Sequence, residues 1–221
     1  MSNRHMPFYL LVVLMLAAML AAWLACWRIP RSAWQLRNIL LASISLAIAT
    51  EAAALVGMFY FMANSIVYNC CTPLEFFLLL WLIHRFRPHW GMALGVAAVI
   101  GCIAMVVDGF FQNPMDFVLV EGVLVISALL SIILLAALWS VATRSDVPLY
   151  RVPEFWLFMG MLLYFGGMVP YIGMIRFLFQ RNPVLAEQVA VLMPLLCIGR
   201  YALTGAACIM QYKRSLGLQD E

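Results

Sequence analysis

Long blocks of apolar residues, separated by short polar segments, follow one another along this chain. A helix needs about 20 apolar residues to cross a bilayer, and the apolar blocks approach or exceed that length. Polar, Pro- or Arg-containing connections separate them. The pattern therefore predicts an all-α, polytopic membrane protein, a seven-transmembrane-helix bundle that forms a single transmembrane domain over residues 1–221. The predicted helices cover approximately residues 6–27, 38–62, 65–86, 91–107, 117–141, 153–179 and 183–212.

Composition excludes a soluble protein. Hydrophobic residues make up 66% of the chain and charged residues 10%, whereas about a quarter of the residues in a soluble domain are charged. The connections are too short to hold a separate enzymatic domain. The net charge of +3 without a long basic cluster gives no reason to expect nucleic acid as a partner. The lipid bilayer is the expected surrounding.

The placement of arginine and lysine predicts the orientation. Cytoplasmic loops carry the excess of positive charge. One side of the predicted bundle holds only Arg4, Arg176 and Arg181. We therefore expect the N-terminus outside, the C-terminus in the cytoplasm, and a multi-pass protein of the inner (plasma) membrane. The basic residues of the other side are Arg28, Arg31, Arg37, Arg85, Arg87, Arg144, Arg151, Lys213 and Arg214.

Three ionisable residues interrupt the predicted spans near their middle. They are Glu51 in the second helix, Glu75 in the third and Arg200 in the seventh. A charge at the bilayer centre costs at least about 2.5–3.5 kcal/mol, so such groups face the bundle interior and find partners. With two carboxylates and one guanidinium, either a cation balances the charge or one carboxyl keeps its proton. The preferred hypothesis pairs Arg200 with one glutamate and protonates the other.

Helical spacing places other polar residues beside these charges. Tyr68, Thr72 and Glu75 share a face of the third helix, and Arg200 and Thr204 share a face of the seventh. This predicts one polar pocket for a ligand or a proton, with the alternative that the charges only lock helices in register. The candidate binding residues are Glu51, Glu75, Arg200, Tyr68, Thr72 and Thr204.

Two prolines fall inside predicted helices. Pro73 cannot donate to the carbonyl of residue 69, and Pro170 stands among glycines in the sixth helix. Proline removes a helical hydrogen bond and bends the helix. We expect kinks at both positions and a cavity that opens to the outside.

Other signals are weaker. Gly91 and Gly95 form a GxxxG pair, which predicts a face for homo-oligomers. His84 and His89 are five residues apart and lack further ligands, so no metal is expected. The six cysteines form no CxxC pair and are interpreted as buried thiols. No catalytic motif and no cofactor motif appear.

One short segment resembles a known family. Cys71-Thr72-Pro73-Leu74 is similar to part of the third helix of the microbial rhodopsins. The resemblance covers four residues, and a retinal Schiff base needs a lysine in the seventh helix, whereas Lys213 is placed beyond it. No cofactor follows from the resemblance.

The leading functional hypothesis is a receptor- or sensor-like membrane protein. It would bind a small or lipid-like ligand in an outward-facing polar pocket and signal through a partner protein, since the chain has no room for a signalling domain. The alternative is a small proton-coupled transporter, which the unbalanced carboxylate and a weak repeat between the two halves favour. A further alternative is an intramembrane enzyme or a structural subunit.

Overall fold

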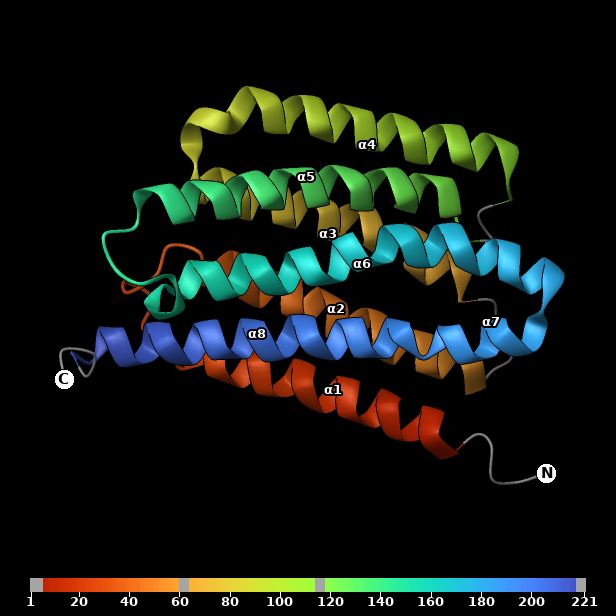
Figure 1. Cartoon of the computed structure of the whole chain (residues 1–221), viewed down its shortest axis with the longest axis horizontal. Helices are drawn as coiled ribbons and strands as arrows, with labels where there is room; N and C mark the ends of the chain where they lie inside the picture. Colours follow the sequence, from red (N-terminus) through yellow and green to blue (C-terminus); the bar gives the residue numbers. More distant parts are fainter. Residues whose placement is uncertain (1–5, 60–63, 114–117, 218–221) are drawn as a thin grey trace. The chain divides into compact units, whose positions relative to one another are not determined.

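The computed structural model describes residues 6–59, 64–113 and 118–217, and in these ranges the regular structure is entirely helical (Figure 1). The described residues contain seven helices that are long and apolar enough to cross a membrane. Short 3-10 turns η1 (Pro88–Trp90) and η2 (Leu149–Arg151) precede α4 and α6. The α-helices are α1 (Met6–Trp27), α2 (Arg37–Phe59), α3 (Ser65–Phe86), α4 (Gly91–Phe111), α5 (Val120–Arg144), α6 (Pro153–Arg181), α7 (Pro183–Ala190) and α8 (Leu192–Ser215).

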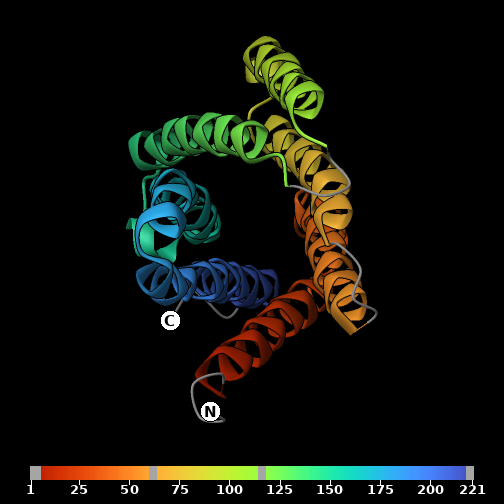
Figure 2. The same cartoon turned by 90° about the vertical axis from the view of Figure 1, so that its right-hand side faces the viewer.

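The chain divides into two compact units. Unit 1 comprises Met1–Pro30 and Ser131–Glu221, and unit 2 comprises Arg31–Leu130. In unit 1, α8 packs against α1 and α6, and α7 packs against α6 (Figure 2). In unit 2, α3 packs against α2 and α4. The single transmembrane domain stays a prediction.

Glycine allows α6 and α8 to approach closely in unit 1. A Cβ atom built on Gly160 would lie 2.9 Å from the carbonyl oxygen of Arg200 and 2.9 Å from Cβ of Leu203. One helix therefore contacts the backbone of the other at this position. This is the small-residue packing that replaces the hydrophobic effect inside a bilayer.

Substitution of Gly160 should loosen this contact. We expect Gly160→Ala to lower the free energy of unfolding by about 1–3 kcal/mol, because the added methyl group must push two backbones apart. Gly173→Ala, on the same helix, is the matched control, since no atom of the described residues lies within 4 Å of its added Cβ. Thermal unfolding in detergent measures both variants. Equal midpoints for the two variants would contradict a tight α6–α8 contact.

Several helix ends agree with the sequence, and others do not. α1 and α3 have the expected bounds. α4 continues to Phe111 rather than ending at residue 107. Each oxygen of the Asp108 carboxylate accepts a hydrogen bond, so this residue is tolerated within the helix. α5 covers Val120–Arg144 rather than 117–141. α2 begins at Arg37 and is described to Phe59, and the expected end at 62 lies outside the described residues.

The last apolar block is two helices, which corrects the single helix expected over residues 183–212. α7 ends at Ala190 and α8 begins at Leu192. Pro194 has no N–H to donate to the carbonyl group of Ala190, so the helical ladder loses a hydrogen bond here. The backbone hydrogen bonds on either side of the break are long. The Val191 N–H donates to the carbonyl oxygen of Gln188 at 3.4 Å, and the Leu195 N–H donates to that of Val191 at 3.5 Å.

The two internal prolines do not interrupt their helices. Pro73 lies inside the continuous helix α3, and Pro170 lies inside the continuous helix α6. The expected kinks and the outward cavity therefore stay predictions. Among the described residues, nothing lies within 4 Å of a Cβ built on Gly95, so Gly95 makes no close helix contact in this part of the chain. The homo-oligomer through Gly91 and Gly95 also stays a prediction.

Candidate functional site

Helices α2 and α3 of unit 2 bring three of the predicted site residues together. The Tyr68 hydroxyl donates to Oε2 of Glu51 at 3.4 Å. Glu75 lies close enough to interact electrostatically with Glu51. Tyr68 and Glu75 are seven residues apart, so they project from the same face of α3 two turns apart. We call Glu51, Tyr68 and Glu75 the acidic cluster.

The sequence explains why α2 and α3 meet at this cluster. Ser43 and Ala54 on α2 are buried, and with Glu51 they follow the three- and four-residue steps of one helix face. Small side chains on this face let α3 approach closely. Thr72 lies between Tyr68 and Glu75 on α3 and is half-buried, as are all three members of the acidic cluster.

The middle parts of the two spans that carry the acidic cluster are poor in basic residues. Residues 38–84 contain no arginine and no lysine. Two carboxylates in an apolar environment repel each other, and this repulsion is relieved when one of them binds a proton or when a cation lies between them. The arrangement is therefore suited to bind a proton or a positively charged group.

Arg200 of unit 1 lies in an aromatic environment. Its side chain is 3% exposed, and the guanidinium carbon is 4.9 Å from the Tyr164 ring centroid, 5.2 Å from Phe165 and 5.1 Å from Tyr201. Aromatic faces attract a cation, and most strongly where water is excluded. Thr204 follows one turn later on α8 and is also buried.

The predicted site residues are thus placed in two groups. Glu51, Tyr68 and Glu75 come together in unit 2, with Thr72 on the same face, whereas Arg200 and Thr204 belong to unit 1. The single pocket formed by all of them stays a prediction, and so does the pairing of Arg200 with a glutamate.

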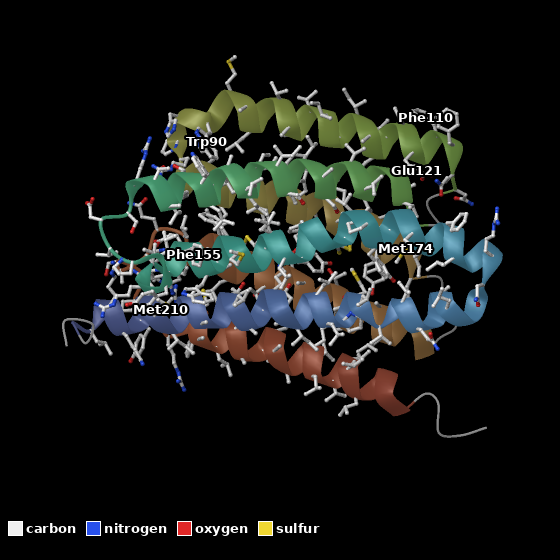
Figure 3. All side chains as sticks on the ribbon, viewed as in Figure 1. Trp90, Phe110, Glu121, Phe155, Met174 and Met210 are labelled. Atoms are coloured by element: carbon white, nitrogen blue, oxygen red, sulfur yellow. The ribbon has the colours of Figure 1, made fainter. Side chains whose placement is uncertain are left out.

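A buried carboxylate that the sequence analysis missed joins α4 to α5 in unit 2. Asp108 is 4% exposed. Its Oδ2 accepts from the Gly122 N–H at 2.9 Å, and its Oδ1 accepts from Nε2 of Gln112 at 2.8 Å. Gln112 also donates to Oε2 of Glu121 at 2.6 Å. Figure 3 shows Phe110 on α4 and Glu121 on α5 at this same end of the two helices.

These bonds form a tertiary cap on α5. The first N–H groups of a helix have no partner within it, and here Asp108 accepts from Gly122 while Oδ1 of Asn69 on α3 accepts from the Leu119 N–H at 2.9 Å. An acidic residue at the end of an apolar block, with glutamine four residues later, is the sequence signal that could have indicated it. Asp108 therefore holds α4 against the start of α5.

Comparisons with known proteins identify no relative of this chain. No protein-family model, no curated protein and no solved structure matches this chain.

Proposed function

We propose that this protein is a receptor-like protein of the plasma membrane that binds a small or lipid-like ligand at the acidic cluster. The observation that carries the proposal is the juxtaposition of Glu51, Tyr68 and Glu75 on facing helices within apolar spans. Ionisable groups at such depth are costly and are retained at functional sites. The proposed orientation, with the N-terminus outside and the C-terminus in the cytoplasm, follows from the distribution of arginine and lysine.

The ligand in this proposal carries a positive charge. Two carboxylates and one phenolic hydroxyl offer acceptors, and residues 38–84 contain no arginine and no lysine. A small organic ammonium ion would replace the repulsion between Glu51 and Glu75 with attraction. The Tyr68 ring adds an aromatic surface of the kind that binds such ions.

Transmission of the signal requires a partner protein in this proposal. The described connections between spans are short, for example Arg28–Leu36 between α1 and α2 and Ser145–Val152 between α5 and α6. Segments of this length do not fold into a domain. A ligand-induced change in the helices would therefore be detected by a separate protein at the cytoplasmic side.

Neutral variants of the acidic cluster test the proposal. We expect tetramethylammonium and related small ammonium ions to stabilise the protein in nanodiscs, measured as a concentration-dependent rise in the thermal midpoint. Glu51→Gln and Glu75→Gln should each weaken binding by about tenfold or more, which corresponds to roughly 1.4 kcal/mol. Each removes one charge with little change in shape.

Glu154→Gln is the matched control, because Glu154 lies in the first turn of α6 in unit 1 and is not a member of the acidic cluster. It should leave binding unchanged. If both cluster variants retained wild-type binding, or if no ammonium ion shifted the midpoint, the ligand-binding proposal would fail.

A proton-coupled carrier is the second candidate, and the neighbouring carboxylates of Glu51 and Glu75 favour it, since a site of two acids can exchange a proton for a cation. Purified protein in liposomes distinguishes the two functions. Flux of an ammonium ion driven by a pH gradient, and lost in Glu75→Gln, would support the carrier. Binding without flux would support the receptor.

A further inference from the structure

The first and last helices of unit 1 bury a pair of thiols. Cys26 lies one residue before the end of α1, and Cys208 lies in α8, seven residues before its end. Both side chains are 0% exposed, both are free cysteines, and a hydrogen bond joins the two thiols. The two thiols therefore lie next to each other inside an apolar interface.

The packing of α1 on α8 accounts for this contact. The two helices approach closely one turn earlier, where a Cβ on Gly205 would be 3.6 Å from Cα of Ala22. Both helices run in the same direction (Figure 1). Four residues along α1 and three along α8 therefore lead from this approach to Cys26 and Cys208. The buried stripes are Met15, Met19, Ala22 and Cys26 on α1, and Tyr201, Thr204, Cys208 and Gln211 on α8.

We propose that Cys26 and Cys208 are an oxidative modification site, which closes to a disulfide between α1 and α8. A disulfide requires Cβ atoms about 3.5–4.5 Å apart. The hydrogen bond between the thiols and the close packing of α1 on α8 bring the two side chains within reach of this geometry. Two S–H bonds break and one S–S bond forms. A small peroxide accepts the two electrons and both protons, and hydrogen peroxide is thereby reduced to two molecules of water.

The site differs from the other cysteines of the chain. Cys70 and Cys102 are exposed, and Cys71 is half-buried; all three belong to unit 2. Cys197 is buried on α8, three turns before Cys208. Cys26 is in the last turn of α1, and oxidation requires this turn to open and admit a small oxidant to the thiols. The disulfide would then prevent α1 from separating from α8.

The experiment detects a covalent link between two fragments of the full chain. A protease site is inserted between Asp146 and Val147, in the exposed connection between α5 and α6. Protein in nanodiscs is treated with hydrogen peroxide, cleaved, and run on a denaturing gel without reductant. We expect the fragments to stay joined, and to separate after dithiothreitol. Cys26→Ser and Cys208→Ser should each abolish the link.

Cys102→Ser and Cys197→Ser are matched controls and should keep the link. Closing so long a loop restricts the unfolded chain, so oxidised wild-type protein should also have a higher thermal midpoint than the reduced protein. Fragments that separate without reductant after oxidation, or a link that survives in Cys208→Ser, would overturn the proposal. The outcome is independent of ligand binding at the acidic cluster.

Discussion

Asp108→Ala is expected to lower the free energy of unfolding by about 3 kcal/mol. The carboxylate is 4% exposed and accepts hydrogen bonds from Gly122 and Gln112. Hydrogen bonds to a charged group contribute about 1.5–3 kcal/mol, and a donor left buried without its acceptor adds a further penalty. Removing the carboxylate leaves the Gly122 N–H at the start of α5 without its acceptor. Thermal and denaturant unfolding in detergent measure the loss.

Two other variants distinguish the loss of the cap on α5 from a loss of stability that any substitution would cause. Asp108→Asn keeps one acceptor oxygen and should lose about half as much stability as the alanine variant. Asp146→Ala, in the exposed connection between α5 and α6, should change stability by less than about 0.5 kcal/mol. A wild-type midpoint for Asp108→Ala would mean that the cap contributes nothing to stability.

Arg200→Ala is expected to destabilise the protein by at least about 2 kcal/mol. Its guanidinium lies within 5.2 Å of three aromatic centroids, and a desolvated cation–π contact contributes about 2 kcal/mol. Truncation also leaves a void between α6 and α8, which adds a cavity term. Arg200→Lys keeps the charge but has no planar face to stack on the rings. It should therefore also lose stability, as measured by thermal unfolding.

An exposed pair provides the matched control. The Arg151 guanidinium lies 5.8 Å from the Tyr150 ring, and both residues are exposed. Arg151→Ala should therefore change stability by less than about 0.5 kcal/mol. If Arg200→Lys were as stable as the wild type, the positive charge alone would matter and the aromatic packing would not.

Local chain properties explain which elements the sequence predicted well. α1 is a uniform apolar segment, and α3 is an apolar segment with a few polar residues. Both are bounded by polar or charged residues, so hydropathy and length locate their ends. α4 was expected to end at residue 107, just before Asp108, and it continues to Phe111. The hydrogen bonds that satisfy the Asp108 carboxylate come from Gln112 and Gly122. Hydropathy alone does not reveal such partners, particularly one on another helix.

The acidic cluster was predicted only in part for a similar reason. Helical periodicity placed Tyr68, Thr72 and Glu75 on one face, since that depends on spacing within a single helix. The hydrogen bond from Tyr68 to Glu51 depends on the register between two helices, which spacing does not specify. Arg200 was expected beside a carboxylate, and this pairing stays a prediction. The structure shows its guanidinium over the rings of Tyr164 and Phe165 on α6, a contact that also depends on the register between two helices.

The sequence by itself determined that this is a helical chain with spans suited to a membrane, and which faces of those spans are polar. These properties follow from the hydropathy and spacing of residues close together in the chain. Tertiary structure alone decided that Asp108 caps α5, that aromatic rings surround Arg200, and that Cys26 contacts Cys208. Each of these contacts joins residues of different helices, and the axial register between packed helices is set by the fit of many side chains at once.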